Sequence, residues 1–162
     1  IVVPRSIDSA PVLPQQHAHF KYDNKVFAAD DWTKIIAVLD WEMATLGDPL
    51  MDLGTSLGYW VNHDDPPIMR ELNMSPTYLP GNPTRSEVVV LYEKMSGRKV
   101  EHPVFYYVYG LFKLAVIVQQ IYARYKLGYT KDPRFAQLIM AVRACAQVGL
   151  QAIDRNRLDQ LF

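Results

Sequence analysis

Residues 17–24 read HAHFKYDN, residues 39–42 read LDWE, and these two stretches together decide the fold. Two β-like runs lie between them, at residues 25–28 and 35–39, and they flank a polar turn. Short runs rich in β-branched residues, separated by such a turn, predict a β-hairpin. A hairpin returns the chain to the edge from which it started, so the two quoted stretches are expected to meet.

Three polar residues in these stretches have the spacing of a phosphoryl-transfer site. In kinase-type catalysis a loop supplies a base, a later Asn in that loop binds metal, and an Asp beyond the next hairpin binds metal too. Asn24 stands five residues after His19, and Asp40 follows the predicted hairpin. Either metal-binding candidate alone would more often be a turn former. Their joint spacing favours a site for Mg²⁺, which prefers oxygen ligands.

These residues resemble the family of aminoglycoside phosphotransferases and choline kinases, whose hallmark is His-Gly-Asp, four residues, Asn, and later Asp-Trp-Glu. The run IAVLDWEMATLGDP at residues 36–49 is similar to the branch of kinase-like domains fused to acyl-CoA dehydrogenases. The resemblance implies that Asn24 and Asp40 hold Mg²⁺, with ATP as co-substrate. It also implies that His17 is a structural histidine and that Asp52 braces the catalytic loop from below.

The sequence departs from the family pattern at two neighbouring positions. Ala18 stands where the family has Gly, and His19 stands where it has the catalytic Asp. An imidazole is longer than a carboxylate and is neutral or cationic, so it would misplace the acceptor hydroxyl and lower activity strongly. No Gly-rich phosphate loop and no Lys-bearing strand precede residue 17. We therefore expect a C-terminal lobe only, completed by an N-terminal lobe from a longer chain or covered by self-association.

The remaining sequence predicts helices. Asp48-Pro49 is the start of an N-capped helix, and Thr84 with Glu87 forms a capping box for a second. The predicted helices follow Asp48 and cover residues 84–96, 103–126 and 133–155, with a proline-rich loop at 62–83. Two strands and four helices give an α+β, mainly helical fold, that of a protein-kinase-like C-terminal lobe. The expected division is an extended lead-in at 1–16, the lobe at 17–155 and a tail at 156–162.

Several side chains near the predicted site have a structural interpretation. Trp41 follows a strand and is expected in the core. Glu42 has two possible roles: it assists the metal site through water, or it is an ordinary exposed carboxylate. The aromatic side chains of the long helix are expected to pack, with room for one or two tyrosines to face a cleft; they are Phe105, Tyr106, Tyr107, Tyr109 and Phe112.

Composition excludes several classes of partner. Lys and Arg number 17, as do Asp and Glu, so the formal net charge is zero and no broad field attracts nucleic acid or an anionic membrane. Cys145 is the single cysteine, which favours a reducing compartment. The apolar run at residues 104–121 is interrupted by Lys113. We expect a soluble, cytoplasmic protein.

Two functions remain open at this level. The first is an enzyme that transfers the γ-phosphoryl group of ATP to a hydroxyl of a small molecule, with His19 in the position of the base. The alternative is a catalytically impaired, kinase-like binding module, supported by His19 and the absent lobe. Neither the loop at 62–83 nor the helices carry a group that identifies the acceptor.

Overall fold

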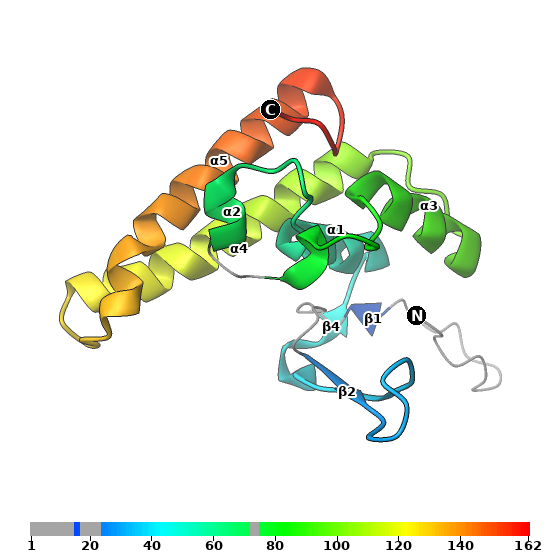
Figure 1. The fold of residues 1–162 in the computed structure, drawn as a ribbon, viewed down its shortest axis with the longest axis horizontal. Helices are drawn as coiled ribbons and strands as arrows, with labels where there is room; N and C mark the ends of the chain where they lie inside the picture. Colours follow the sequence, from blue (N-terminus) through cyan, green and yellow to red (C-terminus); the bar gives the residue numbers. More distant parts are fainter. Residues whose placement is uncertain (1–14, 17–23, 72–74) are drawn as a thin grey trace.

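The computed structural model describes residues 15–16, 24–71 and 75–162, and it has two parts (Figure 1). Helices form one part, and two short antiparallel strand pairs lie on one side of them, below helix α1 in Figure 1. The order of elements agrees with the predicted α+β, mainly helical fold. The strand side carries the residues of the predicted metal site.

The predicted hairpin is confirmed. Strand β2 covers Lys25–Phe27 and pairs antiparallel with β3, Ile35–Val38, with a register shift between Val26 and Phe27. The turn is closed by Asp31, whose carboxylate accepts bonds from the Thr33 amide at 2.9 Å and the Thr33 hydroxyl at 2.6 Å. Asp and Thr close such turns because their side chains bond to the backbone two residues away.

A second strand pair was not predicted. Strand β1, Gln15–Gln16, pairs antiparallel with β4, Thr45–Leu46. Gln15–Gln16 lies within the stretch expected to be an extended lead-in. Each strand has two residues and no periodic pattern, so the sequence carries no signal for it.

Helices α1 and α3 have the predicted caps. Helix α1, Pro49–Tyr59, starts where the Asp48 carboxylate accepts a bond from the Leu50 amide at 2.9 Å. Helix α3, Arg85–Ser96, has the full capping box of Thr84 and Glu87 and ends at Gly97 in the left-handed conformation. Between them, the proline-rich loop contains only the short helix α2, Pro67–Glu71, and a single 3-10 turn at Pro76–Tyr78 within its described residues.

Helices α4 and α5 form a helical hairpin that makes most of the core. Helix α4 covers Pro103–Lys126, and α5 covers Leu138–Arg155 after a 3-10 turn at Pro133–Gln137. The α4 side chains that enter the core are Tyr107, Leu111, Leu114 and Val118. Helix α4 is only partly enclosed, because Phe105, Phe112 and Val116 are exposed on its outer face.

The outer faces of these helices keep their apolar character. By length and composition, α4 and the segment Pro133–Arg155 could each cross a membrane. Core helices of soluble proteins share this property. The hydropathy of these two helices therefore does not decide where the protein resides.

Helices α1 and α4 cross with their backbones in contact. A methyl group placed on Gly110 would lie 1.9 Å from the carbonyl oxygen of Gly54, and one placed on Gly54 would lie 2.2 Å from that of Tyr106. Only glycine permits such an approach. The crossing fixes the position of α1, and with it the chain that leads from Asp40 into this helix.

A buried arginine at the start of α3 joins the loop after α1, the C-terminal segment and α4. Arg85 is fully buried, pairs with Asp65, and donates to the carbonyl oxygens of Trp60 at 2.9 Å and Leu158 at 2.7 Å. Its guanidinium lies 4.7 Å from the centre of the Tyr107 ring, within cation–π range. These bonds satisfy a charge that would otherwise be costly to bury.

The predicted tail, residues 156–162, packs against the helices. Leu158 and Leu161 are buried in the main core. Asp159 accepts a bond from the Asn62 side chain at 2.6 Å, and the Gln160 amide donates to Asp64 at 2.8 Å. These residues therefore form part of the packed structure and connect it to the loop that follows α1.

Candidate functional site

Asn24 and Asp40 meet at the open end of the β2–β3 hairpin. Asn24 directly precedes β2, and its carbonyl oxygen accepts a bond from the Leu39 amide at 2.8 Å. Its side-chain Nδ2 donates to Oδ2 of Asp40 at 3.0 Å, across 16 residues of sequence. Asn24 is 9% exposed, although it lies at the edge of the strand part. The expectation that the hairpin brings these two residues together is met, with the amide nitrogen facing the carboxylate.

The backbone at Asp40 has a left-handed conformation, with φ 71° and ψ 41°. Aspartate visits this region more readily than most residues, because its short polar side chain can bond locally. Strained backbone of this kind gathers at functional sites. At Asp40 it turns the chain out of β3 into a 3-10 turn, Trp41–Met43. Asp40, the predicted metal ligand, is therefore one of three non-glycine residues with positive φ in the described part of the chain.

The stretch that contains the family motif is framed by the two strand pairs. Its described flanking residues are Gln16, which pairs with Thr45, and Asn24, which bonds to Leu39. His17 and His19 lie between them, outside the described residues. Their predicted roles, structural support and the position of the base, stay predictions.

Asp52 lies in the first turn of α1 and is half-buried. Burial lowers the pKa of Lys113 on α4, and the negative charge of Asp52 opposes that shift, which indicates that the two groups are close. Asp52 therefore faces α4 in part. Its predicted role as a brace for the catalytic loop concerns residues outside the described part.

The side chains next to Asp40 differ from expectation. Trp41 is 51% exposed, so its expected place in the core is wrong; its Nε1 donates to the Val38 carbonyl at 2.7 Å, which holds the ring at the surface. Glu42 is exposed. The aromatic set on α4 divides, with Tyr107 buried and Phe105 and Phe112 exposed.

The donor set limits the metal that could bind. Within the described residues, no group of three or more His, Cys, Asp or Glu side chains could hold an ion. Asn24 and Asp40 together supply one amide and one carboxylate. Two such groups fit Mg²⁺, which takes its remaining ligands from water and phosphate, better than an ion that needs a full set of protein ligands.

One hydrogen bond near the site could not be predicted from the sequence. The hydroxyl of Tyr106 on α4 donates to Oδ2 of Asp48 at 2.8 Å, across 58 residues. The sequence predicts Asp48 only as a helix cap and Tyr106 only as one of several aromatic residues. A pairing so distant in sequence leaves no local pattern from which it could be found.

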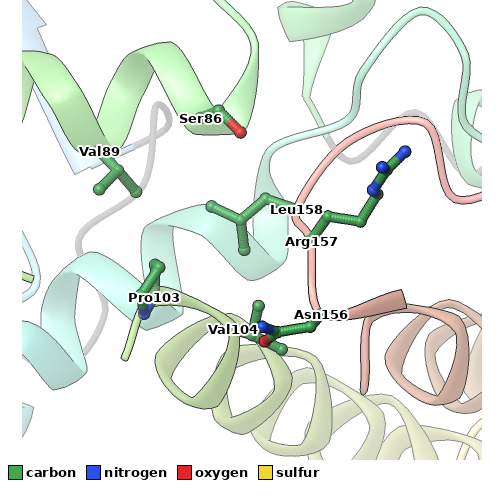
Figure 2. A pocket seen from close by; sticks show the side chains of 7 residues that line it. All are labelled: Ser86, Val89, Pro103, Val104, Asn156, Arg157 and Leu158. Carbon is green, nitrogen blue, oxygen red and sulfur yellow. The ribbon is translucent and has the colours of Figure 1, made fainter. Parts of the chain in front are cut away.

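A pocket of about 270 Å³ lies away from this site, between α3, the start of α4 and the C-terminal segment (Figure 2). Its walls are mainly apolar and come from Val89, Pro103, Val104 and Leu158. In Figure 2 Leu158 points into the pocket, while the Arg157 side chain extends away from it. No group of reactive side chains converges there among its lining residues, and we assign it no role.

Comparison with known proteins also indicates similarity to phosphotransferases. Residues 9–83 match the phosphotransferase enzyme family. Acyl-CoA dehydrogenase family member 11 of Rattus norvegicus is 35% identical over 143 residues, and family member 10 of Mus musculus is 33% identical over 124 residues. These matches cover 86% and 72% of this chain but only 18% and 11% of the relatives.

A solved structure shares the fold. It is a Ralstonia eutropha protein designated an aminoglycoside phosphotransferase, 27% identical, with a TM-score of 0.72. The match covers 87% of this chain and 42% of that one. This chain thus spans under half of the solved protein, and 18% and 11% of the two curated relatives. It has the kinase-like C-terminal-lobe fold, and its predicted resemblance to the phosphotransferase enzyme family, in the branch of the acyl-CoA dehydrogenase family proteins, is confirmed.

Proposed function

We propose that this chain supplies the metal-binding and acceptor-binding half of a small-molecule kinase. The reaction would be transfer of the γ-phosphoryl group of ATP to a hydroxyl of a small molecule. The observation that carries the proposal is the 3.0 Å contact between Asn24 and Asp40, the two residues that the kinase-type pattern assigns to metal binding. The alternative, an impaired binding module, gains no support from the comparisons, whose family match and solved neighbour are phosphotransferases.

Asn24 and Asp40 are the residues that would hold Mg²⁺. The Asn24 amide would rotate about its last side-chain bond to present its oxygen in place of the nitrogen that now faces Asp40. The carboxylate of Asp40 would supply the second oxygen. When bound, Mg²⁺ would neutralise charge on the phosphates of the nucleotide, which is the main chemical need in phosphoryl transfer. The fixed backbone at both residues means that little would have to move.

The hairpin surface is the proposed docking site for the rest of the enzyme. We define it as the large apolar side chains between residues 32 and 46, each at least 44% exposed: Trp32, Ile35, Ile36, Leu39, Trp41 and Leu46. Exposed apolar groups so concentrated mark an interaction site. The solved neighbour is more than twice as long as the stretch that it shares with this chain. We therefore propose that a nucleotide-binding lobe covers the hairpin surface. We also propose that the protein is cytoplasmic.

The metal site can be tested with Mn²⁺, a paramagnetic ion that takes the same oxygen ligands as Mg²⁺. Titration of this chain should broaden the backbone NMR signals of Asn24, Leu39 and Trp41 in a saturable way, and excess Mg²⁺ should reverse the broadening. Asp40→Asn should abolish the effect while keeping the fold, since Asn tolerates the left-handed backbone.

The matched control is Asp30→Asn, the same substitution at an exposed carboxylate in the hairpin turn. It should leave the broadening at Asn24 unchanged. Saturable broadening that persists in Asp40→Asn, or its complete absence in the unmodified chain, would contradict the proposal.

A further inference from the structure

We propose that Tyr106 is a positioning residue for this site, acting from α4 through Asp48 on the strand that frames the metal-binding stretch. The inference rests on the proposed function, because the site it would position is the one assigned there. It starts from the 2.8 Å bond between the Tyr106 hydroxyl and Oδ2 of Asp48.

The chain between Asp40 and α1 determines where the framing strand lies. After the 3-10 turn, β4 pairs with β1, whose last residue, Gln16, stands directly before the family motif. One residue, Gly47, separates β4 from Asp48. The position of Asp48 therefore limits the position of β4, and β4 limits the position of β1.

Asp48 is fixed by both of its carboxylate oxygens. Oδ1 accepts the Leu50 amide at 2.9 Å, which joins it to its own helix, and Oδ2 accepts the Tyr106 hydroxyl, which joins it to α4. An ordinary helix cap needs only the first of these bonds. The second bond holds the β4–α1 junction against a different element.

Tyr106 is itself held in place. Its carbonyl oxygen lies against Gly54 at the backbone crossing of α1 and α4, where no side chain fits between them. Its ring packs edge-on against Phe105, with 5.2 Å between the ring centres. The bond to Asp48 raises the pKa of the Tyr106 hydroxyl above its ordinary value, as expected for a hydroxyl that donates its proton to a carboxylate. Tyr106 thus links the position of α4 to that of Asp48.

The test compares Tyr106→Phe with Tyr122→Phe, the same removal of one hydroxyl farther along α4. Hydrogen exchange at the amides of β4 and Leu50 should accelerate about two- to tenfold in Tyr106→Phe, the usual effect of one lost hydrogen bond. Exchange in the core of α5 should not change, and Tyr122→Phe should match the unmodified chain throughout. Mn²⁺ should also bind Tyr106→Phe more weakly at Asn24 and Asp40, by a similar factor.

Three outcomes would overturn the inference. One is unchanged exchange in β4 for Tyr106→Phe, and another is equal acceleration at every protected amide, which would show a purely global loss of stability. If Tyr106→Phe does not fold, Asp48→Ser replaces it, because the serine hydroxyl can still accept from the Leu50 amide as a helix cap but lacks the second oxygen that accepts from Tyr106; unchanged β4 exchange in that variant would be the third. If the unmodified chain binds no Mn²⁺, the proposed function fails, while the exchange comparison still decides the role of Tyr106.

Discussion

At the scale of single residues, the site depends on an aspartate whose backbone is left-handed. Asp40 could be predicted as a metal ligand because its chemistry and its distance from Asn24 are both visible in sequence. Its conformation could not be predicted, because Asp occupies the ordinary regions far more often. The same limit applies to Trp41, where a local hydrogen bond to Val38 holds at the surface a ring that its type would place in the core.

The substitution His19→Asp tests the base. In a chain that also carries a nucleotide-binding lobe, we expect this variant to raise phosphotransfer, because a carboxylate restores a short acceptor for the proton of the substrate hydroxyl. A positioned base typically contributes about 10² to 10⁴ in rate. Turnover of ATP with a panel of small alcohols measures the gain. Equal or higher turnover with His19 would show that the imidazole is the working base.

The thiol of Cys145 should be inert in the folded chain. Cys145 is buried, and burial raises its pKa to about 11, so almost no thiolate exists at neutral pH. We expect alkylation at pH 8 to be slow in buffer and fast in denaturant. The raised pKa favours the folded state fully below about pH 8.5, the unfolded value, and this stabilisation should fade as the pH rises towards 11. Rapid labelling of the native chain would contradict the burial.

At the scale of elements, the crossing of α1 and α4 leaves no volume for a side chain. Gly110→Ala should destabilise the fold by about 3 kcal/mol or more, since the new methyl would meet the backbone of Gly54 and neither helix can yield easily. Thermal or urea unfolding measures the loss.

The control for this crossing is Gly149→Ala in α5. A methyl there would meet its nearest neighbour at 3.8 Å, an ordinary contact. The change should be neutral or stabilising by up to ~1 kcal/mol, because Ala favours helix over Gly. Comparable losses in both variants would mean that the close approach is not the cause.

Elements with local signals could be predicted, and those built by distant contacts could not. Two helix starts could be predicted from their caps, because a cap acts within one turn. These caps are Asp48 with Pro49, and Thr84 with Glu87. The β1–β4 pair has no such signal, since two residues show no alternation and their partners lie about 30 residues away. The burial of Arg85 also escapes prediction, because its partners come from Trp60, Asp65 and Leu158.

At the scale of the whole molecule, the apolar groups are unevenly covered. The helices share one core, whereas the side chains of the hairpin surface are exposed. An isolated chain with such a surface should self-associate.

Sedimentation at increasing concentration tests this expectation. Replacing Trp32 and Ile36 with Lys should keep the chain monomeric, because both side chains are largely exposed and contribute little to the core. Val90→Lys, at an exposed apolar position on α3, is the control and should not change the association. Monomeric behaviour of the unmodified chain at all concentrations would contradict the proposed docking surface.

The buried arginine has a consequence for biosynthesis. Arg85 and its partner Leu158 are 73 residues apart, so the ribosome adds the second long after the first. At ~5 to 20 residues per second, Leu158 is synthesised roughly 4 to 15 s after Arg85. Leu158 needs further time to leave the exit tunnel. Until then the helical core cannot close around the guanidinium. Folding of this part is therefore expected to finish only after Leu158 has emerged from the ribosome.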